Sequence, residues 1–283
     1  MVDHIFSWRG SPHTVRLDMV CLRSFCDHHD VQDVNWKKIM RMLPPVRRVA
    51  RDRSPTKEEI RAALEGADQR GRALLLVLAS SGIREGAVPG LRLHDYERTT
   101  GTLVVYRGEP EEYTAFVSPE AMDALEKYLN RRCRNGETLG QEVPLFCRKD
   151  GGPLGTSAIR AIVQKMWVDA GIRKREKTWS LKEFKAVHGL RKFFKTYAPR
   201  GMAPETADRD VETMLGHATP YYRPSMDHLL AQYARAVPSL SVTGRVVEKD
   251  KEIEELRREI RSIGEQLKRL ASMAGYTIRE VTK

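Results

Sequence analysis

Two short runs of β-branched and aromatic residues interrupt a chain whose other apolar residues recur with helical spacing. One run is Leu-Val-Val-Tyr at residues 103–106, and the other is Tyr-Thr-Ala-Phe-Val at residues 113–117. A Gly-Glu-Pro turn at residues 108–110 lies between them, which is typical of an antiparallel hairpin. A hairpin with helices on both sides leaves few choices of architecture. We predict a mainly α fold with one small antiparallel β-sheet (α+β).

Helix-start signals lie on both sides of this hairpin. Thr56 followed by Glu59 predicts a capping box, and Ser118 predicts the start of a helix directly after the hairpin. Gly71 breaks the helical pattern, and a strongly apolar helix is predicted after it at residues 72–80. Further helices are predicted at residues 156–170, 188–197, 211–215 and 226–236.

The first 50 residues have the pattern of a small helical unit. An apolar face recurs every three or four residues and consists of Val15, Met19, Leu22 and Phe25. A second short helix is predicted at residues 36–42, and a basic connector follows at residues 47–53. We therefore expect three parts: a short helical domain with its linker at residues 1–53, a larger domain at residues 54–245, and a C-terminal segment at residues 246–283.

The C-terminal segment carries a heptad pattern. Its apolar residues step by three and four and are Ile253, Leu256, Ile260, Ile263, Leu267 and Leu270. Such an a/d seam predicts a coiled-coil-like helix that associates with a copy of itself. The alternative is a single amphipathic helix docked on its own protein.

The charge of the chain favours a polyanionic partner. Lys and Arg number 49 against 38 Asp and Glu, which gives a net charge of +11. Residues 248–283 hold 9 basic and 8 acidic side chains, so a charge of +10 lies on the residues before them. A basic folded body is typical of nucleic-acid-binding proteins, although many other enzymes share it.

Cysteine usage and hydropathy bear on the compartment. The four cysteines form no C-x-x-C pair, so neither a zinc site nor a disulfide framework is expected, and reduced thiols fit a cytoplasm. The longest apolar run covers residues 73–79, far short of the roughly 20 residues that span a membrane. We expect no membrane segment, no secretory signal, no metal and no cofactor.

Four short motifs follow one another in an order that suits phosphate chemistry. They are Gly82-Ile83-Arg84, His188-Gly189-Leu190-Arg191, Leu215-Gly216-His217 and Tyr221-Tyr222-Arg223-Pro224. Guanidinium groups bind phosphate oxygens through paired hydrogen bonds, and histidine transfers protons near neutral pH. With the intervening helix–hairpin–helix pattern, the motifs resemble the tyrosine recombinase (phage-integrase) family over about residues 54–240.

This resemblance implies a site-specific DNA recombinase, or integrase. Such an enzyme cuts and rejoins duplex DNA through a 3′-phosphotyrosine intermediate, without metal or ATP. Arg84 and Arg191 would clamp the scissile phosphate, His188 would transfer protons, and His217 would donate a hydrogen bond to a phosphate oxygen. Tyr221 would be the nucleophile, with Tyr222 as the alternative.

The resemblance also implies partners and a setting. The hairpin sequence and the Tyr-Tyr-Arg-Pro run are most similar to archaeal members, including integrases of mobile elements. The expected partner is double-stranded DNA, bound by a homo-oligomer of two to four protomers, with accessory DNA-bending proteins as possible further partners. The expected location is the cytoplasm, in association with the nucleoid.

Two departures from the family pattern bear on the mechanism. The hairpin lacks the lysine that protonates the leaving 5′ oxygen, and Arg107 is the basic side chain there that would replace it by stabilising charge. Tyr221 and Tyr222 follow His217 by four and five residues, whereas the family spacing is about nine. Cleavage either in cis after a rearrangement or in trans on a neighbouring subunit would accommodate the shorter loop. The short N-terminal domain would clamp DNA less completely than the family's usual bundle.

Other interpretations stay open at this point. The chain could be a DNA-binding protein on the same fold with reduced or lost catalysis, or a type IB topoisomerase-like relaxing enzyme. His188 and His217 could be ordinary helix-end residues, and Arg84 and Arg191 could pair with Glu85 and Glu183 on the surface. Three aromatic residues are expected to serve packing alone: Trp179, Phe184 and Tyr233.

Overall fold

The computed structural model describes residues 12–31, 34–43, 53–173, 184–244 and 263. The chain divides into two compact units, Met1–Arg51 and Asp52–Lys283. The predicted heptad seam lies outside the described residues apart from Ile263, and so does most of the basic connector.

The smaller unit contains two described helices, α2 (Pro12–His28) and α3 (Trp36–Met42), as predicted. Val15 and Met19 of α2 pack with Ile39 and Leu43 in a small apolar cluster. Phe25, predicted on the apolar face, is instead 60% exposed. The next residue, Cys26, is the buried one in this turn of α2, so the covered face of the helix does not include Phe25.

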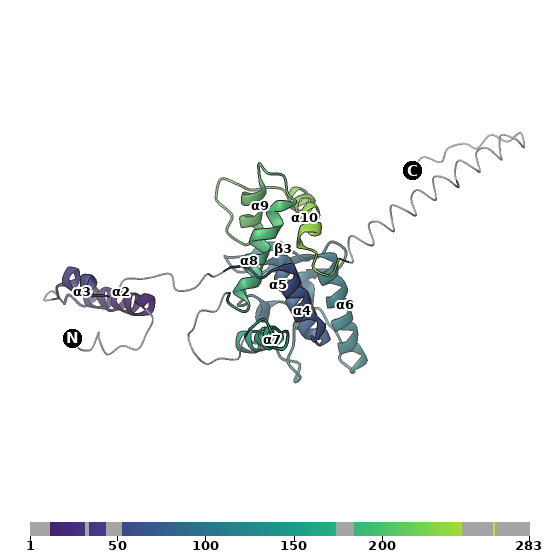
Figure 1. Ribbon diagram of the computed structural model, residues 1–283, viewed down its shortest axis with the longest axis horizontal. Helices are drawn as coiled ribbons and strands as arrows, with labels where there is room; N and C mark the ends of the chain where they lie inside the picture. The colour runs from purple at the N-terminus through teal and green to yellow at the C-terminus, as the bar shows by residue number, and fades with distance from the viewer. Residues whose placement is uncertain (1–11, 32–33, 44–52, 174–183, 245–262, 264–283) are drawn as a thin grey trace, which may run out of the picture. The chain divides into compact units, whose positions relative to one another are not determined.

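The larger unit is built around α5 (Gln69–Ser81), whose residues from position 73 to position 81 are all buried. Four helices contact it, namely α4 (Lys57–Glu65), α6 (Pro119–Arg134), α7 (Thr156–Asp169) and α8 (His188–Tyr197) (Figure 1). α5 is the central helix of the unit, and its C-terminal end is therefore fixed in position by packing on several sides.

Local capping explains where these helices begin. The predicted capping box of Thr56 and Glu59 starts α4, and the Ser118 hydroxyl accepts from the N–H of Ala121 in the first turn of α6. α5 begins earlier than predicted, because the Asp68 carboxylate caps it by accepting from the N–H of Gly71 at 2.7 Å. Gly71 therefore lies inside the helix, where an added Cβ would stand 3.2 Å from the sulfur of Met166.

The sheet has three antiparallel strands in the order β1 (Tyr96–Glu97), β2 (Thr102–Val105) and β3 (Tyr113–Phe116). β2 and β3 form the predicted hairpin, with Val105 opposite Tyr113. β1 was not predicted, because two residues are too few to show strand alternation. The mainly helical fold with one small antiparallel sheet is confirmed.

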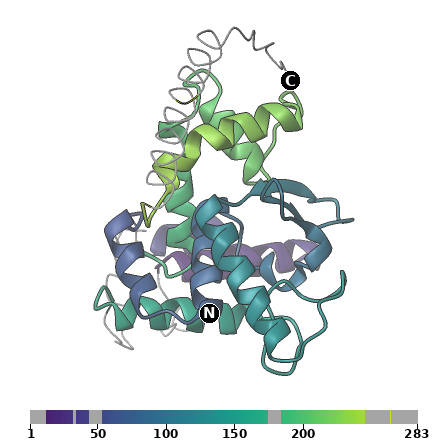
Figure 2. The same ribbon diagram turned by 90° about the vertical axis from the view of Figure 1, so that its right-hand side faces the viewer.

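The remaining elements complete the unit. They are α9 (Ala207–Met214), α10 (Met226–Leu240) and the short 3-10 segments Val88–Gly90, Leu93–Asp95 and Ala198–Arg200. Figure 2, like Figure 1, shows α9 and α10 at one end of this unit and α7 at the other. The boundaries differ from the predicted ones: α9 begins four residues earlier, and α10 continues past residue 236 to Leu240.

Two of the aromatic packing predictions fall on described residues and are confirmed. Tyr233 is buried between Phe116 and Phe194, and its hydroxyl donates to the carbonyl of Ser80 at 3.0 Å. Phe184 is also buried. Trp179 lies outside the described residues.

Candidate active site

Arg191 of α8 connects two loops that are far apart in the sequence. Its Nη1 donates to the carbonyl of Gly82 at 2.7 Å, and its Nη2 donates to the carbonyl of Leu215 at 2.9 Å. These carbonyls stand two residues before Arg84 and two residues before His217, respectively. One guanidinium therefore aligns the two loops that carry the other predicted site residues.

Gly82 allows the first of these loops to approach closely. It ends α5 in the left-handed conformation with φ 63°, and its N–H donates to the carbonyl of Leu78 at 3.1 Å. A Cβ at this position would lie 2.8 Å from the side chains of both Leu215 and Phe194. Glycine is therefore needed here for its backbone conformation and for its small size.

The predicted residues Arg84, Arg191 and His217 come together. Nη2 of Arg84 contacts Nε2 of His217, and Nη2 of Arg191 lies 3.4 Å from the same nitrogen. Arg84 and His217 are exposed, whereas Arg191 is half-buried, and burial together with the charge of Arg84 lowers the pKa of Arg191 below its usual range. An arginine remains protonated after such a shift, so the cluster presents two cations to an incoming anion.

His217 is held from its other side by Glu212. Nδ1 of His217 lies 2.8 Å from Oε2 of Glu212, whose second oxygen contacts Nζ of Lys195 on α8. Partial burial acts to raise the pKa of Glu212, but the hydrogen bonds from Lys195 and His217 prevail and lower it. Glu212 and Lys195 were not predicted, because a carboxylate five residues before a histidine carries no signal in the sequence.

His188 is the first residue of α8 and lies one helical turn before Arg191. Its side chain is exposed. The structure therefore places His188 at the N-terminal end of the helix that carries Arg191.

The ring of Tyr113 on β3 packs against the loop at Gly216, next to His217. Tyr113 was not predicted as a site residue. A Cβ on Gly216, which has φ 74°, would lie 2.6 Å from the ring of Tyr113. Burial raises the pKa of the Tyr113 hydroxyl, and the nearby charges of Arg191 and Arg84 oppose that rise. The hairpin therefore contacts the site through this ring.

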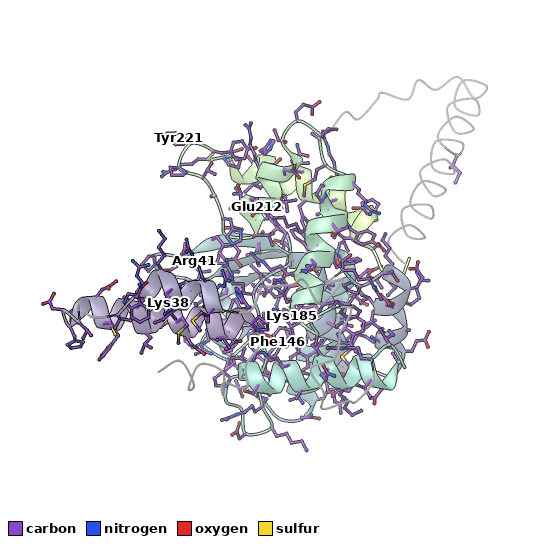
Figure 3. All side chains as sticks on the ribbon, turned by 60° about the vertical axis from the view of Figure 1, so that its left-hand side comes forward. Lys38, Arg41, Phe146, Lys185, Glu212 and Tyr221 are labelled. Carbon is purple, nitrogen blue, oxygen red and sulfur yellow. The ribbon has the colours of Figure 1, made fainter. Side chains whose placement is uncertain are left out.

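Tyr221 and Tyr222 are adjacent in sequence but differ in environment. Tyr221 is 99% exposed, and Figure 3 shows it on the loop between α9 and α10, away from Glu212. The hydroxyl of Tyr222 donates to Asp210 at 2.7 Å, and this fully buried carboxylate also lies 3.1 Å from Nε2 of His228. Burial and the bond to Asp210 raise the pKa of Tyr222.

Arg107 makes contacts within the sheet region. Its Nε lies 2.5 Å from the buried carboxylate of Asp95, and its Nη2 donates to the carbonyl of His94 at 3.2 Å. Its described hydrogen bonds therefore do not include Arg84, Arg191 or His217. Glu85, considered above as a partner for Arg84, pairs instead with Arg160 of α7, and Glu183 lies outside the described residues.

Two broader features of the described residues concern metal binding and membrane spans. Within them, no group of three or more His, Cys, Asp or Glu side chains is arranged to hold a metal ion. None of their helices combines the length and the apolar character that crossing a membrane requires.

Comparison with known proteins places this arrangement in a family. Residues 54–222, more than half of the chain, match the model of the phage integrase family. The chain belongs to the phage integrase family. This match contains the loop of Arg84, helix α8 and the loop that carries His217 and both tyrosines.

The similarity to a curated relative also covers more than half of this chain. A protein named tyrosine recombinase XerC from Thermodesulfovibrio yellowstonii is 30% identical over 179 residues, which cover 60% of this chain and 55% of the relative. The chain thus spans about half the length of this curated relative.

Two solved structures share the fold of this family member. The XerH site-specific recombinase, in a post-cleavage complex with a palindromic difH substrate, matches with a TM-score of 0.57 at 17% identity, over 89% of this chain and 71% of its own. A lambda integrase dimer bound to a COC′ core site matches with a TM-score of 0.51 at 14% identity, over 75% of each chain. At this identity the similarity concerns the fold.

Proposed function

We propose that this chain is a site-specific DNA recombinase of the integrase type, which breaks and rejoins duplex DNA through a 3′-phosphotyrosine intermediate. The observation that carries the proposal is the convergence of Arg84, Arg191 and His217 from three separate segments on one position. A scissile phosphate is an anion that gains negative charge as an oxygen attacks phosphorus, so this group of donors suits its transition state.

The proposed chemistry follows from these donors. The two guanidiniums bind the non-bridging oxygens of the phosphate, and Nε2 of His217 donates to one of them once it is protonated. The tyrosine oxygen attacks phosphorus, its proton passes to His188 or to solvent, and the bond from phosphorus to the 5′ oxygen breaks as that oxygen takes up a proton. The phosphotyrosine linkage conserves the energy of the broken phosphodiester bond. A 5′ hydroxyl can therefore attack it and reverse the reaction without ATP.

We assign the nucleophile to Tyr221 and not to Tyr222. Among the described residues the Tyr221 hydroxyl has no hydrogen-bond partner, and its side chain is almost fully exposed. Tyr222 donates its proton to a buried carboxylate and lies beside Arg209, 5.7 Å from the ring centre. Using Tyr222 would remove the shorter of two side-chain contacts of the buried Asp210, 2.7 Å to Tyr222 against 3.1 Å to His228, whereas using Tyr221 would break no described hydrogen bond.

We further propose that duplex DNA is the substrate and that protomers act in pairs or tetramers on it. The charge of +10 before residue 248 supports this. Of the two related structures named above, one is bound to its difH substrate and the other is a dimer bound to a core site. DNA affinity should fall steeply with salt because phosphate contacts release counterions. Residues 1–53 would contribute a second DNA-binding part, and residues 246–283 a self-association helix.

The finer setting is also a proposal. The hairpin sequence and the Tyr-Tyr-Arg-Pro run support an integrase of an archaeal mobile element, acting on DNA in the cytoplasm. Arg107 would stabilise charge near the leaving oxygen only after leaving Asp95. This engagement, together with the hairpin's lack of lysine, favours one second candidate: a DNA-binding protein with reduced catalysis.

Trapping of a covalent complex tests the proposal. We expect the protein, incubated in EDTA with nicked DNA from the region flanking its own gene, to form an adduct that survives SDS. The Arg84→Ala variant should bind the same DNA and form far less adduct. Binding by wild type with no adduct on any nicked substrate would support the second candidate instead.

A further inference from the structure

The backbone itself places Glu212 against His217. α9 ends in a Schellman motif, in which the N–H of His217 donates to the carbonyl of Glu212 at 2.8 Å and the N–H of Gly216 donates to Thr213 at 3.0 Å. The first and last side chains of this motif ordinarily meet through an apolar contact. Here the two side chains are a carboxylate and an imidazole, and they meet through the 2.8 Å contact between Oε2 and Nδ1.

This contact determines which ring nitrogen carries the proton. An ionised carboxylate only accepts hydrogen bonds, so Nδ1 of His217 is the protonated nitrogen. Nε2 is then the nitrogen that faces Arg84 and Arg191. Both guanidiniums only donate, so before DNA binds the lone pair of Nε2 accepts from them.

Lys195 holds the carboxylate in place. Its Nζ contacts Oε1 of Glu212, which leaves Oε2 for His217. Lys195 lies on α8, the helix that carries Arg191, so the contact ties the last turn of α9 to the helix of the phosphate clamp. The carboxylate is about one-third exposed, at 32%, and is not free to rotate while both partners are bound.

We propose that Glu212 is a positioning residue for His217, with Lys195 as its support. This inference rests on the proposed function. Glu212 holds the ring so that Nε2 points at the phosphate, and its negative charge stabilises the imidazolium that donates to a phosphate oxygen. Within the described residues, the charged side chains in contact with His217 are Arg84 and Arg191 at Nε2 and Glu212 at Nδ1. Lys195 contacts the same carboxylate.

A double-mutant cycle tests this coupling in the full-length protein. We expect Glu212→Gln to lower the single-turnover cleavage rate about tenfold, which is less than the roughly 10²–10⁴-fold that a group transferring the proton itself contributes. DNA affinity should stay within about twofold. In a His217→Ala background the same substitution should have no further effect, because the group it positions is absent.

The matched control is Glu205→Gln, which removes an exposed carboxylate seven residues earlier and should leave the rate unchanged. An equal loss of rate in the presence and absence of His217 would overturn the inference, since it would show a role for Glu212 that is independent of this histidine. A Glu212→Gln variant that cleaves at the wild-type rate would overturn the inference as well.

A second measurement separates this inference from the proposed function. Nitrogen-15 NMR of the histidine rings reports the tautomer of His217 whether or not the protein cuts DNA. At a pH where the ring is neutral, we expect the proton on Nδ1 in wild type and a shift of population toward Nε2 in Glu212→Ala. If wild type forms no DNA adduct but has the Nδ1 tautomer, the function fails and the positioning stands. A proton on Nε2 in wild type would overturn the positioning.

Discussion

The guanidinium of Arg191 donates to the carbonyl of Gly82 at 2.7 Å, across 109 residues of sequence. The same group donates to the carbonyl of Leu215 at 2.9 Å. Arg191 thus has two duties in our account: it binds phosphate, and it aligns the loops that hold Arg84 and His217. Arg84 contacts His217 but, within the described chain, makes no hydrogen bond to backbone. This difference between two arginines is testable.

Arg84→Ala and Arg191→Ala should therefore separate catalysis from stability. Each removes one charged donor from the transition state, so each should lower the cleavage rate by about 10²–10³. Only Arg191→Ala leaves two carbonyls without their donor, which should cost about 1–3 kcal/mol of unfolding free energy. Single-turnover cleavage and urea unfolding measure the two effects. Arg134→Ala, at the exposed end of α6, is the control, and equal stability of all three variants would contradict the bridging role.

Phenylalanine substitutions should distinguish the two adjacent tyrosines. Tyr221→Phe should abolish the covalent adduct with no change in stability, since the Tyr221 side chain is 99% exposed. Tyr222→Phe should still form the adduct. Its free energy of unfolding should fall by about 1–2 kcal/mol, because the buried carboxylate of Asp210 loses the hydrogen bond that it accepts from Tyr222 at 2.7 Å. The assignment fails if Tyr222→Phe is the variant that forms no adduct.

Gly216→Ala should damage both the fold and the site. The residue has φ 74°, and an added Cβ would lie 2.6 Å from the ring of Tyr113. We expect the free energy of unfolding to fall by more than about 1 kcal/mol. Cleavage should also be slower, because His217 is the next residue and would be displaced. Gly86→Ala is the matched control, since a Cβ there meets nothing within 4 Å. Thermal unfolding of the two variants gives the comparison, and equal melting temperatures would contradict the prediction.

The stability contributed by Glu212 should depend on pH in one direction. The bonds from Lys195 and His217 outweigh partial burial and lower its pKa below the ordinary 4.5. A group whose pKa is lower in the folded state stabilises the fold above its unfolded pKa and loses that effect as pH falls. The advantage of wild type over Glu212→Gln should therefore be present at pH 7 and shrink below about pH 4.5. Urea unfolding of both proteins across this range tests it, and a constant difference would count against it.

Local signals in the sequence were sufficient for the elements that depend on neighbouring residues. The Thr56 and Ser118 caps and the hairpin turn each act over a few residues, and all three were predicted where the structure has them. The strand β1 and the exposure of Phe25 were not, because each depends on what lies opposite it in space.

In the candidate site, too, residues in local motifs were predicted, and residues whose contacts depend on the folded chain were not. The sequence placed Arg84, Arg191 and His217 in three motifs of a phosphate site, and the structure brings these side chains together. Glu212 was missed because its role comes from the turn at Gly216, which folds the chain back on the end of α9. The attachment of Arg107 to Asp95 was missed because it joins the hairpin to a separate loop.

The most direct test is to identify the residue that becomes joined to DNA. Protein trapped on a nicked substrate in EDTA would be digested with nuclease and trypsin and sequenced by mass spectrometry. Tyr221 and Tyr222 are adjacent with no Lys or Arg between them, so trypsin leaves both on one peptide, and fragmentation must assign the phosphate. Our account predicts a phosphotyrosine at Tyr221. A modified Tyr222, or DNA binding with no modified tyrosine at all, would contradict it.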